Sequence, residues 1–337
     1  MDSDSSSLVQ QRITHLIQAM GKHIPIRPLA ALIVAYVFER EKIWLFFGDH
    51  EIASRIFTTR CLIAFDPQEK SWTKYEIQDP VQNWAIPFKT PQGFIWSSRN
   101  KLVCGEFEEK NKIVTRTISV ERSQSKGSFL SFFGVGEVVV QLFSAYKNQI
   151  QKNRLFQNGV WSALPASCSI NFEKSAVHWN PITWTLLVFG GHTVVREKGG
   201  DKYLTLNTCF VMTKLSGKWE KWPSLIVPRA KAAVVFHGLS QSYLISGGWV
   251  AEDPDFQDSK GLDSIERFDI KTQQWSLLTF KLPTHLWNHW MFIYDNDLII
   301  LGKQTWICNL SQEGFPYGDW NSIPGQWDYQ PENVFMM

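Results

Sequence analysis

The stretch that decides the fold is Leu186-Leu187-Val188-Phe189-Gly190-Gly191. It is an uninterrupted apolar run that ends on two glycines. The chain then passes through a variable segment to a second apolar run at residues 209–212, and from there to Trp219. Strands that are buried on both faces of a sheet appear in sequence as short continuous apolar runs of this kind.

The same order of features occurs in two other parts of the chain. Residues 244–248 and 265–269 precede Trp275, and residues 44–48 and 62–66 precede Trp72. In all three copies, seven positions separate the last apolar residue of the later run from the tryptophan. A constant spacing of this kind indicates a repeated structural unit, and the fold follows from the repeat.

The glycines that end the apolar runs give the period of the repeat. Gly191 follows Gly48 by 143 positions, Gly248 follows Gly191 by 57, and Gly302 follows Gly248 by 54. The first interval leaves room for three repeats of about 48 residues each. Six repeats therefore fit between Arg27 and Pro324.

This pattern resembles the kelch repeat, whose signature is a strand ending in paired glycines, an aromatic residue with an acidic neighbour, and a downstream tryptophan. A period near 50 residues is typical of kelch among repeat architectures. The resemblance covers nearly the whole chain and is weakest in the second and third repeats, which match by spacing alone. It implies an all-β chain, a six-bladed kelch-type β-propeller in which each blade is a four-stranded antiparallel sheet.

The repeat predicts the strands and the packing between blades. The 16 tryptophans are expected to fill the gaps between neighbouring sheets, with Trp72, Trp219 and Trp275 buried there. The paired glycines at 190–191 and 247–248 are expected at inner strand ends, where they let the backbone bend. The strands expected in the first, second, third and sixth repeats are 31–36, 43–48, 61–65 and 71–76; 84–88, 93–97, 102–107 and 113–119; 129–134, 138–143, 154–157 and 160–164; and 289–294, 298–302, 305–310 and 319–323.

Three segments make up the expected domain organisation. Residues 1–26 form an N-terminal extension that is expected to be helical, because its apolar residues fall on one helical face. Residues 27–324 form the propeller, and residues 325–337 form a C-terminal tail. The extension is too short to be an F-box or BTB domain, so we expect it to pack on the propeller or to dock a partner.

Composition narrows the cellular setting. A net charge of +2 from 34 basic and 32 acidic side chains predicts no nucleic-acid partner. The acidic start of the chain does not resemble a signal peptide, and no apolar run approaches the length of a membrane span. We expect an intracellular, cytoplasmic protein without membrane association. Its five cysteines are expected to be buried apolar residues and not disulfide partners.

Some kelch-like propellers are enzymes, and we looked for their chemistry in the chain. The iron-binding motif of specifier proteins is absent, and so is the export signal that accompanies galactose-oxidase-like copper enzymes and sialic-acid mutarotases. No P-loop, Rossmann glycine motif, HExxH or CxxC sequence is present. His285 and His289 are spaced for a metal site on a helix but not on a strand. We therefore expect no catalytic residue, metal or cofactor.

The kelch resemblance implies that one face of the propeller, formed by the loops after the second strands, binds partners. The segment 193–205 is a long basic loop, and 250–262 is a long acidic loop. These two loops either pair with each other or present a charged groove to a partner. Trp249 is the expected main anchor, unless it packs inside its own blade. The candidate partner-binding residues are Asp49, His50, His192, Arg196, Trp249, Asp253, Asp255 and Lys303.

These observations predict a non-catalytic scaffold that recognises a partner protein through its loop face. One alternative is a structural subunit of a larger assembly, viral or organellar, in which the divergent second and third repeats form the docking edge. A second alternative is a sugar-active enzyme or mutarotase that uses the central pocket.

Overall fold

In the computed structural model, the described part of the chain is all-β, and every regular element in it is a strand. Side-chain environments are described chiefly from residue 174 onward. Among the described residues, no helix has the length and apolar character needed to cross a bilayer. The structure describes residues 43–51, 56–66, 71–82, 87–90, 93–98, 101–108, 112–120, 129–135, 138–143, 154–157, 160–163, 174–180, 185–197, 200–213, 218–251, 259–287, 289–294, 296–302, 304–323 and 333–336.

Four of the sheets are antiparallel, with four strands each, and three of these lie in the second half of the chain. The strand order in each is the order of the chain, so each sheet is a meander apart from one inserted hairpin in two of them. Their strands are β8 (Phe129–Val135), β9 (Val138–Phe143), β10 (Arg154–Gln157) and β11 (Val160–Ala163); β12 (Ala176–Asn180), β13 (Thr185–Phe189), β16 (Cys209–Thr213) and β17 (Glu220–Trp222); β18 (Ala233–His237), β19 (Ser242–Ser246), β22 (Ser264–Asp269) and β23 (Gln274–Lys281); and β24 (Trp290–Tyr294), β25 (Asp297–Leu301), β26 (Thr305–Leu310) and β27 (Pro316–Ile323).

The first part of the chain forms one eight-stranded sheet with the order β28-β1-β2-β3-β7-β6-β5-β4. Two antiparallel groups meet in it, joined by a short parallel pairing of β3 with β7 at Glu76↔Lys112 and Ile77↔Ile113. Its strands are β1 (Ile43–Glu51), β2 (Ile56–Asp66), β3 (Ser71–Gln82), β4 (Pro87–Thr90), β5 (Gly93–Ser98), β6 (Lys101–Glu108), β7 (Lys112–Val120) and β28 (Asn333–Met336).

The C-terminal segment contributes a strand that the repeat pattern does not predict. β28 lies within the expected tail and pairs antiparallel with β1, with Ile43 opposite Met336. An edge strand exposes a row of unpaired N–H and C=O groups, and the apolar segment 334–336 satisfies part of that row. The strand expected at 31–36 and the N-terminal extension 1–26 lie outside the described residues.

Two segments that we expected to be loops contain β-hairpins. β14 (His192–Glu197) pairs with β15 (Gly200–Thr205), and β20 (Trp249–Ala251) pairs with β21 (Ser259–Gly261). The loop prediction for 193–205 was wrong because it weighed charge above strand propensity. In that segment, β-branched and aromatic residues flank a glycine pair, which is a hairpin signal.

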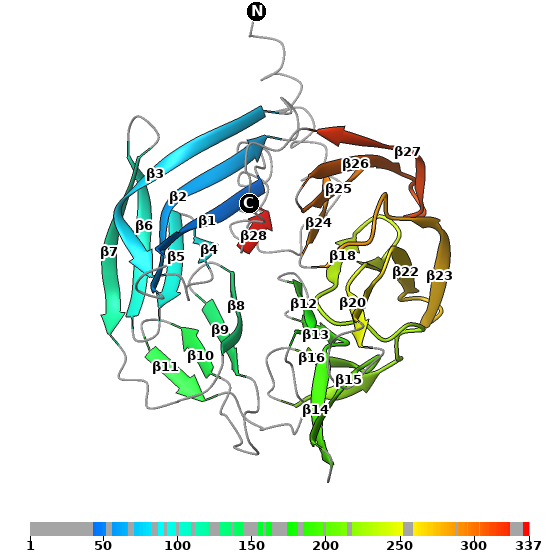
Figure 1. Ribbon diagram of the computed structural model, residues 1–337. Helices are drawn as coiled ribbons and strands as arrows, with labels where there is room; N and C mark the ends of the chain where they lie inside the picture. The colour runs from blue at the N-terminus through cyan, green and yellow to red at the C-terminus, as the bar shows by residue number, and fades with distance from the viewer. Residues whose placement is uncertain are drawn as a thin grey trace, which may run out of the picture.

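The sheets lie side by side around the molecule, with their first strands toward the middle (Figure 1). β12 contacts β18, and β18 contacts β24. Apolar side chains fill the space between neighbouring sheets. Phe189 and Tyr243 belong to one cluster that joins the sheets of β13 and β19, and Leu244 and Ile300 belong to another that joins the sheets of β19 and β25.

The tryptophans predicted to lie between sheets are partly buried where they are described. Trp275 packs edge-on to Phe189 of the preceding sheet, with ring centroids 5.9 Å apart. Its indole Nε1 donates a hydrogen bond to the carbonyl oxygen of Pro223, at 2.9 Å. Trp219 is also partly buried, whereas the side chain of Trp72 lies outside the described part. Trp275 therefore joins two sheets by packing and by a directional bond.

The glycine pairs at 190–191 and 247–248 follow β13 and β19 as the repeat predicts. All four have positive φ, from 57° to 101°, a region that favours glycine. A Cβ on Gly190 would overlap the carbonyl oxygen of Arg229, and one on Gly247 would overlap that of Leu286. The glycines therefore let the connection to the next sheet cross directly over the strand end.

Two of the five cysteines are described, and both are free, buried thiols. Burial raises the pKa of both Cys209 and Cys308 to about 12. The backbones of Cys61 and Cys104 lie in β2 and β6, and Cys168 lies outside the described residues.

We predict that the chain forms no disulfide and that Cys209 and Cys308 react with a thiol reagent only after unfolding, because the thiolate is the reactive form. Thiol counting in native buffer and in denaturant, with gels run with and without reductant, measures this. A mobility shift on reduction, or full native reactivity of all five thiols, would contradict the prediction.

Candidate functional site

The candidate site is the end of the sheets at which the two hairpins begin, which we call the hairpin end. His192 begins β14 and Trp249 begins β20, directly after the glycine pairs of consecutive sheets. The two rings contact each other, with centroids 6.0 Å apart. Only 1% of His192 and 6% of Trp249 are exposed. These two predicted residues therefore come together, but inside the protein.

The hairpins are joined to each other as well. The backbone N–H of Ala251 in β20 donates a hydrogen bond to Oγ1 of Thr205 at the end of β15, at 2.9 Å. The bases of the two long segments therefore lie side by side.

The other predicted site residues are not brought together by described contacts. Asp49 and His50 lie in β1, and Arg196 lies in β14; only their backbones are described. Asp253, Asp255 and Lys303 lie outside the described residues.

An exposed tryptophan that we did not predict lies beside the β20–β21 hairpin. Trp287 is 45% exposed and belongs to the connection from β23 to β24, at the hairpin end. A Cβ on Gly261 of β21 would lie 3.0 Å from its ring and 3.0 Å from Cβ of His285. We expected the tryptophans other than Trp249 to pack between sheets. The signal that this expectation missed is the position of Trp287 in a connection, outside any strand.

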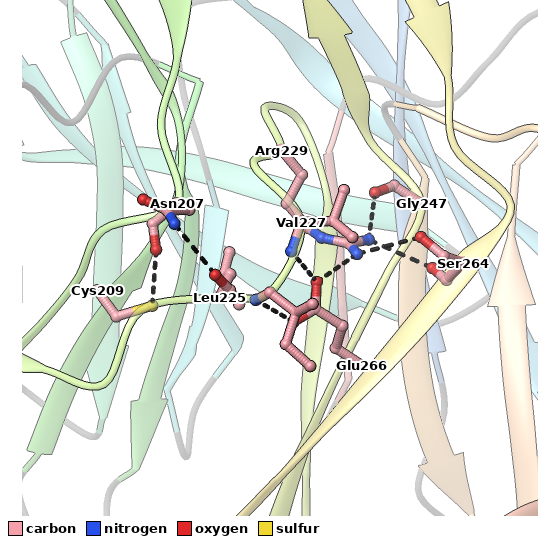
Figure 2. Close-up of polar contacts among 9 residues, drawn as sticks. Asn207, Cys209, Leu225, Val227, Arg229, Gly247, Ser264 and Glu266 are labelled. Atoms are coloured by element: carbon pink, nitrogen blue, oxygen red, sulfur yellow. Dashed lines mark hydrogen bonds and ion pairs between the residues drawn. The ribbon is translucent and has the colours of Figure 1, made fainter. Parts of the chain in front are cut away.

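A buried ion pair holds the connection from β17 to β18 under the hairpin end (Figure 2). Nη2 of Arg229 lies 2.6 Å from Oε1 of Glu266 in β22, and both side chains are fully buried. Burial lowers the pKa of Arg229, and the charge of Glu266 opposes that effect. A buried guanidinium beside a buried carboxylate remains paired because leaving either charge alone is costly.

Each partner of the pair also binds backbone groups. Nη1 of Arg229 donates to the carbonyl oxygens of Gly247, at 2.8 Å, and Ser264, at 3.3 Å. The carboxylate of Glu266 accepts the backbone N–H groups of Ile226, at 2.7 Å, and Val227, at 3.0 Å. The pair therefore fastens one connection to the strand ends of the next sheet (Figure 2).

A second buried polar contact lies at the start of the last four-stranded sheet. Nε2 of His289 and Oγ of Ser246 are 2.8 Å apart, and both residues are buried. Burial, and to a smaller extent the charge of Arg229, lowers the pKa of His289 to about 3. His289 is therefore neutral at physiological pH and serves as a hydrogen-bond partner between sheets.

The histidine pair considered as a metal site does not meet. His285 is exposed, whereas His289 is buried against Ser246. In the part of the chain that the structure describes, no three His, Cys, Asp or Glu side chains are grouped as metal ligands.

Comparison with known proteins finds no family model that matches the chain and no curated protein that resembles it.

We predict that Glu266→Gln lowers the free energy of unfolding by about 3–5 kcal/mol, because it leaves the Arg229 charge buried without a counter-charge. Chemical denaturation of purified protein measures the change. The control is Asp263→Asn, which breaks an exposed pair with Lys281 at 3.0 Å and is expected to cost less than about 1 kcal/mol. Equal effects of the two substitutions would contradict the role given to the buried pair.

We predict that acid destabilises the chain in part through His289. Its folded pKa of about 3 lies below the ordinary histidine pKa of 6.5. Neutral His289 therefore contributes fully to the free energy of unfolding above pH 6.5. This contribution is lost as the pH falls toward the folded pKa, by up to about 1.4 kcal/mol per pH unit. His289→Gln keeps a polar partner for Ser246 and removes the titration, so the free energy of unfolding should fall less steeply between pH 6 and 4. Identical pH profiles for the variant and the wild type would contradict this account.

Proposed function

We propose that the chain is a six-bladed, kelch-like β-propeller that acts as a non-catalytic scaffold and binds a partner protein at its hairpin end. Trp287 is the observation on which the binding proposal depends.

The sheet topology supports the propeller proposal. Four sheets have four strands each, and the eight-stranded sheet divides at the parallel β3–β7 pairing into two groups of four. The first strands of successive sheets contact each other along β12, β18 and β24. In a closed ring, β28 would take the inner position beside β1, where it joins the two ends of the chain and covers the edge of β1.

The hairpin end supports the binding proposal. The β14–β15 and β20–β21 hairpins are not part of the four-stranded sheets, and Figure 1 shows β14 extending away from its sheet. Insertions on a rigid scaffold are where binding residues are commonly placed. Trp287 exposes nearly half of its surface beside one of these hairpins. Tryptophan is enriched among the residues that contribute most to interfaces.

Trp249 and Trp287 have different environments and, we propose, different roles. Trp249 is buried, contacts His192, and lies 5.5 Å under the ammonium group of Lys174. It holds the base of the β20–β21 hairpin. Of the two tryptophans, Trp287 is the one whose side chain is accessible to a partner.

The buried free thiols of Cys209 and Cys308 support an intracellular, cytoplasmic setting.

We predict that Trp287→Ala weakens partner binding by about 2 kcal/mol, roughly 30-fold, with little change in stability. Proteins recovered from cell extract with the wild type would first identify candidate partners, independently of the variants. Titration of the purified partner against both forms, with thermal unfolding of each, then measures affinity and stability separately.

Two further variants control this experiment. Tyr317→Ala removes a 52% exposed aromatic side chain from β27, at the opposite end of its sheet, and should leave affinity unchanged. Trp249→Ala should lower the free energy of unfolding by about 3–5 kcal/mol, because it empties a buried site. A partner that binds wild type and Trp287→Ala equally, or that is lost only with Tyr317→Ala, would overturn the assignment of the hairpin end.

A further inference from the structure

Two lysines occupy equivalent positions in consecutive sheets. Lys174 and Lys231 each lie two residues before the first strand of a sheet, β12 or β18. They begin the related sequences Lys-Ser-Ala-Val and Lys-Ala-Ala-Val. The backbone N–H of Lys231 donates a hydrogen bond to the carbonyl oxygen of Lys174, at 2.7 Å. The two sheets thus bring the same residue type to one place at the hairpin end.

Both lysines have a left-handed backbone. Their φ angles are 55° and 53°, a region in which glycine and asparagine are favoured and lysine is not. Strained residues of this kind cluster at functional sites and persist where the surrounding structure fixes them. The other two described non-glycine residues with positive φ, Gln241 and Gln273, lie in turns between strands. The same strain at two equivalent positions, with lysine at each, directs attention to the two ammonium groups.

The aromatic pair of the hairpin end lies beside these lysines. Nζ of Lys174 is 5.5 Å from the ring centroid of Trp249, a cation–π distance. Trp249 in turn contacts His192. Burial, followed by the charges of Lys174 and Lys231, lowers the pKa of His192 to about 4. At neutral pH the imidazole is therefore uncharged.

The charge of Lys174 acts on the ammonium group of Lys231. Burial lowers the pKa of Lys231, and the charge of Lys174 lowers it further. An anion bound beside a partly buried ammonium group favours the charged form of that group. Each ammonium offers N–H donors and has no acceptor, so it is suited to the oxygen atoms of an anion.

We propose that Lys174 and Lys231 bind one oxyanion group, a carboxylate or a phosphate, above the Trp249–His192 pair at the hairpin end. The cation–π contact holds Lys174 in place, and neutral His192 adds no charge of its own. The site stands independently of the partner protein proposed above. The anion is either a free small ion or a group carried on an acidic peptide segment.

The first test uses inorganic phosphate as the probe. Thermal unfolding is followed across millimolar phosphate at constant ionic strength set with chloride, below the concentrations at which phosphate acts as a general stabiliser. Binding to the folded state raises the melting temperature in a saturable way. Lys231→Asn keeps a residue that tolerates the left-handed backbone, so it should fold as well as the wild type. It should weaken phosphate binding about ten-fold or more.

The matched control is Lys271→Asn, which removes an exposed lysine from the turn between β22 and β23. It should retain the full saturable response. Lys231→Arg preserves the charge and should recover most of the binding. A wild type without a saturable response, or equal responses in Lys231→Asn and Lys271→Asn, would overturn the proposal.

A second measurement identifies the source of the anion. Nuclear magnetic resonance of the labelled Lys231 side chain reports its pKa, which bound phosphate or acetate should raise. The same titration with a peptide of alternating glutamate and glycine compares a carboxylate on a chain with the free ions. Tighter binding of the peptide indicates an acidic protein segment, and tighter binding of phosphate indicates a free ion. A Lys231 pKa that none of the three probes changes would refute the site, whether or not Trp287 binds a partner.

Discussion

The hairpin end depends on one buried interaction, the ion pair of Arg229 with Glu266. Buried ion pairs often contribute no more than an apolar pair of the same volume, because both charges lose their hydration. This pair differs in what else it binds. An alkyl chain in place of the guanidinium would lose the hydrogen bonds to the carbonyls of Gly247 and Ser264. The carboxylate accepts hydrogen bonds from the N–H groups of Ile226 and Val227. The pair thereby joins the connection between β17 and β18 to the paired ends of β19 and β22 in the next sheet.

The glycine pairs and the ion pair together allow the connection between two sheets to pass close over the end of a strand. The connection between sheets crosses the end of the second strand so closely that Gly191 donates its N–H to the carbonyl of Arg229, at 2.9 Å. Gly248 makes the corresponding bond to Leu286, at 2.8 Å, one sheet later. Only residues without a Cβ allow this approach, and the close approach places Arg229 where it reaches Glu266. Each glycine pair in the sequence therefore marks a connection of the same geometry in the structure. The hairpins begin directly after these glycine pairs, at equivalent positions in the two sheets.

The strands were predictable from sequence because each is a short apolar run between punctuating residues, as in β13, β19 and β25. The elements that the sequence pattern did not predict depend on neighbouring segments of the structure. The hairpin of β14 and β15 was hidden by its charges, and β28 is too short to be distinguished from a tail without its partner β1. Trp249 and Trp287 look alike in sequence, yet one is buried under Lys174 and the other is exposed beside Gly261. Sequence places a side chain at an end of a sheet, but neighbouring segments determine whether that side chain reaches solvent.

The same division between scaffold and surface explains where the chain tolerates strain. Lys174 and Lys231 hold an unfavourable backbone directly beside strands whose side chains are almost wholly buried, such as β13 and β19. A rigid, well-packed sheet can maintain such a conformation, because relaxing it would disturb the packing of both neighbouring sheets. A lysine in a mobile loop would instead rotate away from its neighbour and lower the repulsion. The packed cores therefore do more than stabilise the fold, since they hold the backbones of these two lysines side by side at the hairpin end.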